Sequence, residues 1–161
     1  MLTRLALFLL LTCAARAEQW TGLVVAIQDG DTITVLRGKD QVKIRLDGID
    51  CPEKAQPYGN RAQQKTADLS FQRTVTVVGK SKDRYGRTLA SVILPNGRSL
   101  NEELLRAGLA WWYRKYAPKN RALERLEEAA RESRLGLWAD PDPTPPWLWR
   151  KEKKSSPGSA P

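Results

Sequence analysis

Acidic and basic residues gather between positions 29 and 53 with a spacing that suits metal-assisted chemistry on a phosphate. The segment opens with Asp29-Gly30-Asp31-Thr32 and closes with Asp50-Cys51-Pro52-Glu53, and Arg45 lies between the two motifs. Carboxylate oxygens are ligands of hard divalent cations, and a guanidinium pairs with two oxygens of a phosphate. We therefore expect Asp31 and Asp50 to hold a cation, Arg45 to bind phosphate and Glu53 to transfer a proton.

The same residue types have simpler readings. An aspartate in a turn commonly accepts hydrogen bonds from nearby backbone amides. Arg45 could be a solvated surface arginine, and so could Arg87 in the motif Asp83-Arg84-Tyr85-Gly86-Arg87. Glu53 could be an ordinary loop carboxylate. Spacing alone leaves the metal site and the turn reading open.

The composition excludes several kinds of catalytic site and favours one class of partner. The 161 residues include no histidine, which excludes a Ser-His-Asp triad, a histidine general base and a histidine-ligated zinc site. Any proton transfer must use carboxylates, tyrosine, lysine, cysteine or metal-bound water. The 27 Lys and Arg against 18 Asp and Glu give a net charge of +9, which favours a polyanionic partner, either nucleic acid or an anionic membrane surface.

The N-terminus has the pattern of a secretory signal. Arg4 precedes the apolar run 5–11, and Ala15-Arg16-Ala17 is a small-x-small site, so we expect cleavage before Glu18 and export to the periplasm or the medium. The apolar run is too short to span a membrane. Acylation of Cys13 is a minor alternative. Without that segment Cys51 is the remaining cysteine, so no internal disulfide can form and we expect the thiol to be buried.

Alternating and periodic patterns predict a small mixed domain. Residues 42–46 alternate so that Val42, Ile44 and Leu46 share one face and Arg45 lies on the other. The predicted fold is mainly β with helices (α+β), and we expect a five-stranded Greek-key barrel of the OB-fold type. The strands are expected at 20–27, 32–36, 42–46, 75–78 and 89–94, and about three helices at 61–71, 99–108 and 121–134.

The same patterns divide the chain. We expect a signal peptide at 1–17, an OB-fold domain at 18–140, a Pro/Trp-rich extension at 141–150 and a disordered tail at 151–161. We expect the extension, with its Trp147-Leu148-Trp149 run, to cap the barrel; a nucleotide-stacking platform is the weaker alternative.

The motifs in this order resemble the staphylococcal nuclease (thermonuclease) family over about residues 20–138. The motifs that carry the resemblance are Asp29-Gly30-Asp31-Thr32, Arg45-Leu46, Asp50-Cys51-Pro52-Glu53, Asp83-Arg84-Tyr85-Gly86-Arg87 and Leu105-Arg106-Ala107-Gly108-Leu109-Ala110. Each motif alone is weak, but their combination in one order is specific. The resemblance implies an OB-fold barrel and a Ca²⁺-dependent nuclease that acts on DNA and RNA and leaves 3′-phosphates.

The resemblance also implies roles for single residues. Asp31, Asp50 and the backbone carbonyl of Cys51 would ligate Ca²⁺. Arg45 and Arg87 would bind the scissile phosphate, and Glu53 would be the general base. The residues that would contact the nucleotide are Arg84, Tyr85 and Tyr116.

Two positions depart from the family pattern. Cys51 replaces a threonine, which a backbone ligand tolerates, and Arg114 stands where a tyrosine is expected. The rival hypothesis is a non-catalytic OB-fold module that binds nucleic acid without cutting it. Because all five catalytic and metal positions are filled, we favour the enzyme, acting as a monomer without stable membrane insertion.

Overall fold

The computed structural model describes residues 18–155. The predicted signal peptide and the last six residues of the predicted tail lie outside the described residues.

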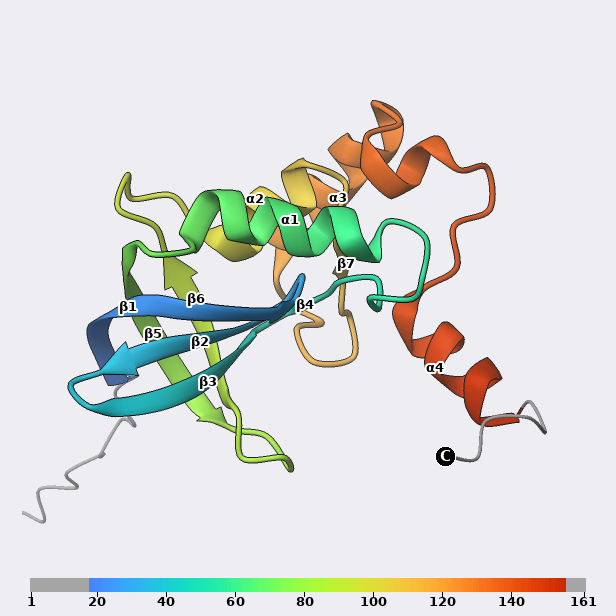
Figure 1. The fold of residues 1–161 in the computed structure, drawn as a ribbon. Coiled ribbons are helices and arrows are strands. Elements are labelled where there is room, and N and C mark those ends of the chain that lie inside the picture. The colour runs from blue at the N-terminus through green and yellow to red at the C-terminus, as the bar shows by residue number, and fades with distance from the viewer. Residues whose placement is uncertain (1–17, 156–161) are drawn as a thin grey trace, which may run out of the picture.

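Five strands form a closed barrel, as the sequence predicts (Figure 1). Around the barrel the order is β1-β2-β3-β6-β5, and β3 pairs with β6 in parallel while the other neighbours are antiparallel. The strands are β1 (Glu18–Asp29), β2 (Thr32–Arg37), β3 (Asp40–Leu46), β5 (Thr74–Lys82) and β6 (Thr88–Ile93). This closed mixed architecture is the OB-like barrel expected from the sequence.

The barrel core is built from β-branched and aliphatic side chains that alternate along the strands. On β3, Ile44 and Leu46 are fully buried, whereas Arg45 between them points to the opposite face, as the alternation predicts. The other fully buried core residues of the strands include Val24, Ile33, Val35, Val75, Val77, Ala90 and Val92.

Three helices cover the barrel where the sequence predicts them. They are α1 (Gly59–Ser70), inserted before β5, α2 (Leu100–Arg106) and α3 (Arg121–Glu132). The side chain of Ser99 accepts a hydrogen bond from the backbone N–H of Glu102 and so caps α2. Asn120 caps α3 in the same way through the N–H of Leu123.

A second, two-stranded sheet lies beside the barrel. It pairs β4 (Ile49–Asp50) with β7 (Trp111–Trp112), within the stretch 109–116 whose aromatic content suggested extended structure. Glu127 of α3 is fully buried and accepts a hydrogen bond from the N–H of Trp112 at 3.0 Å. Helix α3 therefore fixes β7, and β7 fixes the strand that carries Asp50.

The C-terminal segment is more ordered than the sequence suggested. After the 3-10 turn η1 (Gly136–Ala139), helix α4 runs over Pro146–Ser155, so it extends into the stretch expected to be a disordered tail. Pro146 is the first residue of the helix, a position that proline favours because its fixed φ suits the first turn. The carbonyl of Pro145 accepts hydrogen bonds from the N–H groups of Leu148 and Trp149. Helix α4 stands at the side of the barrel near β4 and β7 (Figure 1).

Within residues 18–155, none of the helices combines the length and the apolar character that crossing a bilayer requires.

Candidate active site

One guanidinium joins the two aspartates that were expected to share a cation. Arg45 Nη1 lies 2.9 Å from Asp31 Oδ2, and Arg45 Nη2 lies 2.7 Å from Asp50 Oδ1. Arg45 comes from β3, Asp31 from the turn between β1 and β2, and Asp50 from β4. The three side chains are almost entirely buried, with exposed fractions of 12, 7 and 1% for Arg45, Asp31 and Asp50. Their oxygens and nitrogens therefore converge in a largely desolvated pocket.

Strand pairing explains why these side chains meet. Thr32 of β2 pairs with Arg45 of β3, and the N–H of Leu46 donates to the carbonyl of Asp31 at 2.8 Å. Across the site, the N–H of Cys51 donates to Asp31 Oδ2 at 2.7 Å. Both acidic motifs are thus fixed at the same end of the barrel by backbone contacts.

The turn that carries Asp31 packs tightly against α1. The hydroxyl of Thr66 donates to the carbonyl of Gly30 at 2.6 Å. A Cβ atom at Gly30 would lie 2.7 Å from the Cβ of Ala62 and 2.8 Å from the Cβ of Cys51. A side chain at position 30 would therefore push the turn, and Asp31 with it, away from the barrel.

Burial raises the pKa of two carboxyl groups and of the thiol at the site. Burial, with the nearby charge of Asp31, raises the pKa of Asp29 to about 7. Burial also raises the pKa of Asp50, although Arg150 and Arg45 act against the shift. Burial raises the pKa of the Cys51 thiol well above its ordinary value, so its side chain is not a ready thiolate ligand. A bound cation would relieve the repulsion among the carboxylates.

Side chains provide only some of the ligands that a hard divalent cation would need. Asp31 and Asp50 provide carboxylate oxygens that both contact the guanidinium of Arg45. Within residues 18–155, no three His, Cys, Asp or Glu side chains gather closely enough to hold a metal ion by themselves. Further ligands would have to be backbone carbonyls, water or substrate oxygens, as is common for Ca²⁺ and Mg²⁺.

The second expected arginine reaches the same place from another loop. Arg87 follows the turn between β5 and β6, and its Nε lies 2.8 Å from Asp83 Oδ2. Its Nη1 lies 3.4 Å from the hydroxyl of Thr32, the residue next to Asp31. Burial works against ionisation of Asp83, but the hydrogen bonds from Arg87 and Tyr85 outweigh it and lower the pKa of Asp83. Arg87 is thus held beside the acidic pocket by a carboxylate of its own loop.

Glu53 lies at the same pocket and pairs with a residue from the far end of the chain. Its Oε1 lies 2.5 Å from Nη1 of Arg150, which belongs to α4. Arg150 Nη2 also lies 2.8 Å from Asp50 Oδ2. The expected general base and one expected metal ligand therefore share a guanidinium that the sequence did not single out.

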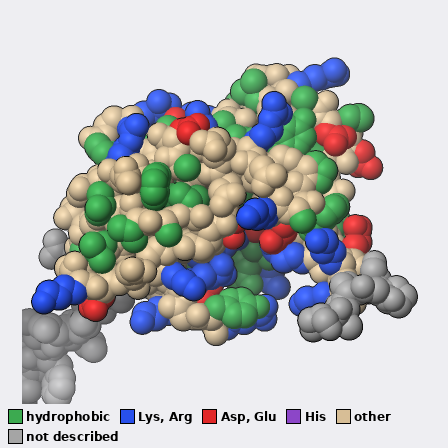
Figure 2. Space-filling model, viewed as in Figure 1, with side chains coloured by type: hydrophobic (Ala, Val, Ile, Leu, Met, Phe, Trp, Pro, Cys, Tyr) green, Lys and Arg blue, Asp and Glu red, His purple; other side chains and the backbone are tan. Residues whose placement is uncertain are grey.

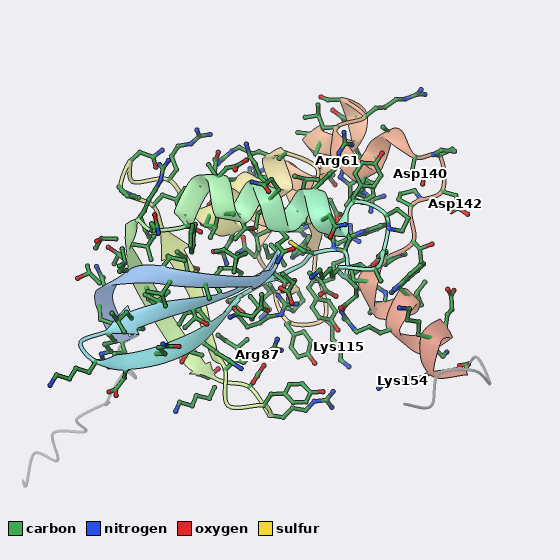
Figure 3. The ribbon with its side chains drawn as sticks, in the orientation of Figure 1. Arg61, Arg87, Lys115, Asp140, Asp142 and Lys154 are labelled. Atoms are coloured by element: carbon green, nitrogen blue, oxygen red, sulfur yellow. The ribbon has the colours of Figure 1, made fainter. Side chains whose placement is uncertain are left out.

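A cleft with a volume of about 850 Å³ collects these groups. Arg87, Lys115 and Lys154 lie on the lower side of Figure 3, and Figure 2 shows basic side chains around acidic ones on that part of the surface. The cleft is lined by every residue to which the sequence assigned a role, namely Asp31, Arg45, Asp50, Cys51, Glu53, Arg84, Tyr85, Arg87 and Tyr116.

Aromatic rings form part of the cleft wall. Tyr113 and Tyr116 meet edge to face with ring centroids 4.7 Å apart. Tyr85 is 67% exposed and accepts a hydrogen bond from Arg84 Nη2 at 2.6 Å. Exposed rings beside a basic cleft can stack on nucleobases.

Sequence reasoning missed Tyr113 and Arg150. Arg114 turns away to pair with Glu127 at 3.1 Å, and its neighbour Tyr113 lies on the cleft. An aromatic therefore lines the cleft beside the position where the family pattern lacks one. The Trp-Leu-Trp-Arg run before Lys151 was the signal for Arg150, because its tryptophans mark a segment that packs rather than a solvated tail.

Comparisons with known proteins find similarity to nucleases over most of the chain. A family model described as staphylococcal nuclease homologue matches residues 43–140. A micrococcal nuclease of Shigella flexneri is 41% identical over 160 residues, which cover 94% of this chain and 91% of that protein. An uncharacterized endonuclease of Escherichia coli O157:H7 is 45% identical over 132 residues, 82% of this chain and 86% of that protein. The staphylococcal-like nuclease CAN1 of Arabidopsis thaliana is 40% identical over 112 residues, 70% of this chain but 34% of that protein.

Proposed function

We propose that this chain, which belongs to the staphylococcal nuclease homologue family, is a Ca²⁺-dependent endonuclease that hydrolyses phosphodiester bonds in DNA and RNA. The observation that carries the proposal is that Arg45 contacts both Asp31 and Asp50 in one buried pocket. A site built only to hold nucleic acid has no need of buried acids, because they repel phosphate. The acids make sense if a cation shares the pocket with the substrate.

The cation would be held by Asp31, Asp50 and the carbonyl of Cys51. Bound there, it would supply positive charge beside the phosphate, as Lewis-acid cations do in phosphoryl transfer.

The two arginines would bind and stabilise the phosphate. Arg45 and Arg87 would donate hydrogen bonds to its nonbridging oxygens, on which negative charge grows during attack. Arg87 is pre-positioned for this task because Asp83 holds its Nε and its side chain lines the cleft beside Thr32.

Glu53 would accept the proton of the attacking water. Its side chain is 38% exposed, so water can reach it, and it stands next to Asp50 through the shared contact with Arg150. A carboxylate is a weak base and Ca²⁺ acidifies water poorly, so the attacking water should be activated more readily, and activity should rise, toward alkaline pH. A sharp optimum near pH 5 would oppose this role. By the family resemblance, the products would carry 3′-phosphates.

The flanking strand would lie along the basic and aromatic wall of the cleft. The cleft is lined by Tyr113, Tyr116, Arg84 and Tyr85, and the exposed rings of Tyr85 and Tyr116 are free to stack on bases. Stacking contributes about 1–3 kcal/mol per base and tolerates any sequence. The cleft therefore suits a single strand or a frayed duplex of either sugar type.

Digestion of supercoiled plasmid tests the proposal. Protein beginning at Glu18 is incubated with plasmid in Ca²⁺, in EGTA, and in EGTA followed by excess Ca²⁺. We expect nicked and then linear DNA in the first and third reactions and intact plasmid in the second. A mobility shift without cleavage in Ca²⁺ would instead identify a binding module, and a mock purification controls for contaminating nuclease.

Export completes the proposal. The basic, apolar and small-residue pattern of residues 1–17 supports a cleaved signal that delivers the nuclease to the periplasm or the medium. N-terminal sequencing of the protein recovered from fractionated cells should find Glu18 first. Recovery of chains that still begin at Met1 in the cytoplasm alone would refute export.

A further inference from the structure

We propose that Arg150 of helix α4 is a positioning residue of the active site, which holds the carboxylates of Asp50 and Glu53 in one relative orientation. The proposal rests on the proposed function for the role of Glu53, but its contacts stand independently. Arg150 Nη2 lies 2.8 Å from Asp50 Oδ2, and Nη1 lies 2.5 Å from Glu53 Oε1 and 3.3 Å from Asp50 Oδ1. One planar fork therefore bridges the two acids.

The two acids differ in how much they need such a bridge. Asp50 is 1% exposed, and its Oδ1 already accepts from Arg45, so it is fixed without help from α4. Glu53 is 38% exposed and stands in a loop, and Arg150 is the ion-pair partner that the structure gives it. Arg150 thus links the partly exposed side chain of Glu53 to the buried side chain of Asp50.

A second contact links the same loop to the same C-terminal segment. The side-chain carbonyl of Gln56 accepts a hydrogen bond from the backbone N–H of Glu53 at 3.1 Å. Its Nε2 donates to the backbone carbonyl of Thr144, which precedes α4. Gln56 is buried, so this bridge is shielded from water. The segment before α4 and the helix itself therefore support the Glu53 loop at two points.

Aromatic packing fixes α4 where Arg150 can reach. The Trp147 ring stacks on Tyr113 with centroids 5.2 Å apart and planes 2° from parallel. It also meets Trp111 edge to face at 5.6 Å. Trp111 is the direct partner of Asp50 in the small sheet. Trp111, which contacts Trp147 of α4, and Asp50, which Arg150 contacts, therefore belong to the same small sheet. The sheet fixes the distance between them.

The contact is compatible with a working site. Each carboxylate oxygen has more than one acceptor position, so a donated hydrogen bond from Arg150 leaves room for a further ligand. An arginine guanidinium keeps its charge at any working pH, so the bridge between the two carboxylates remains ionic. A misplacement of about 1 Å in a catalytic group can cost about 100-fold in rate.

Kinetics of Arg150→Ala, Arg150→Lys and Arg125→Ala on a single-stranded oligonucleotide in Ca²⁺ test the proposal. We expect kcat of Arg150→Ala to fall about 10- to 100-fold with KM changed less than about threefold. Arg150→Lys should recover only a small part, because one ammonium cannot span two carboxylates. Guanidinium ion added to Arg150→Ala should restore part of the rate. Arg125 is exposed on α3, so Arg125→Ala matches the charge change and should act like wild type.

Hydrogen exchange gives a readout that needs no cleavage. Backbone amides of residues 52–57 should exchange faster in Arg150→Ala than in wild type, and they should be unchanged in Arg125→Ala. If wild-type protein fails to cut DNA but this difference appears, the proposed function fails and the positioning role stands.

Two results would overturn the positioning role. The first is a kcat of Arg150→Ala equal to or above that of wild type, which would make Arg150 a bystander or an inhibitory latch. The second is unchanged exchange over residues 52–57. Should Arg150→Ala not fold, Arg150→Lys carries the same comparison, because it preserves the charge and the helix.

Discussion

Asp83 holds Arg87 at two places: its Oδ2 lies 2.8 Å from Arg87 Nε, and its Oδ1 accepts from the backbone N–H of Arg87 at 2.9 Å. The loop between β5 and β6 thereby presents the arginine to the cleft before any substrate arrives. A donor that is already oriented costs no reorganisation when charge develops on a phosphate. The hydrogen bonds that order this loop therefore also orient Arg87 in the site.

The Asp83 contact should appear in the pH dependence of stability. Because the folded pKa of Asp83 is lowered from its ordinary 3.8, its contribution is fully present above that value and is lost as the pH falls through the folded pKa. Asp83→Asn should therefore cost about 1 kcal/mol at pH 7 and much less near pH 2. Urea unfolding of both proteins at the two pH values measures this. A difference that does not depend on pH would contradict the assignment.

Arg87→Ala should lose activity without losing the fold. The side chain is 27% exposed and lies at the edge of the barrel, so the free energy of unfolding should change by about 1 kcal/mol or less. Its loss as a phosphate donor should lower kcat about 10²- to 10³-fold. Steady-state cleavage of an oligonucleotide, with Arg125→Ala as the charge-matched control, measures the effect. Wild-type turnover in Arg87→Ala would remove Arg87 from the mechanism.

Arg45→Ala should lose both activity and stability. Its removal leaves the buried carboxylates of Asp31 and Asp50 without the guanidinium that they share. Breaking a buried ion pair costs about 3–5 kcal/mol. Adding Asp31→Asn to Arg45→Ala should recover part of that loss, because Arg45 is the ion-pair partner that the structure gives Asp31, whereas Asp50 keeps its contact with Arg150. Urea unfolding of the single and double variants gives the comparison. A double variant less stable than Arg45→Ala would show that repulsion is not the cause.

Trp147→Ala should mimic the loss of Arg150. The substitution removes the ring that stacks on Tyr113 and contacts Trp111, so α4 should detach from the small sheet. We expect kcat to fall about as far as in Arg150→Ala, and the double variant to fall little further, because both changes break one unit. Kinetics of the two single variants and the double variant measure this coupling. Fully additive losses would show that the helix and its arginine act separately.

Local patterns in the sequence were enough to predict the barrel and the face on which Arg45 lies. The alternation of Val42, Ile44 and Leu46 placed Arg45 on the opposite face because side chains along a strand have a period of two. The turn chemistry of Asp29-Gly30-Asp31 and the break at Pro52 marked the ends of strands that then meet at one end of the barrel. These inferences needed only neighbours in sequence.

The contacts that the sequence could not predict are long-range. Arg150 and Asp50 are 100 positions apart, and the charged run after Trp149 has the composition of a solvated tail. The structure shows that the run is helical and that the packing of Trp147 on Tyr113 and the contacts of Arg150 turn it toward the site. Whether Tyr113 or Arg114 faces the cleft depends on the pairing of the preceding strand β7. That strand has two residues, too few for an alternation of side chains to be recognised in the sequence.

The most direct test of the central claim separates cutting from binding. Wild type and Asp50→Asn are compared on one labelled oligonucleotide, with binding measured in EGTA and cleavage measured in Ca²⁺. We predict that both proteins bind with similar affinity and that cleavage by Asp50→Asn falls at least about 100-fold, because the variant cannot hold the cation. Equal cleavage rates in the two proteins would contradict the account.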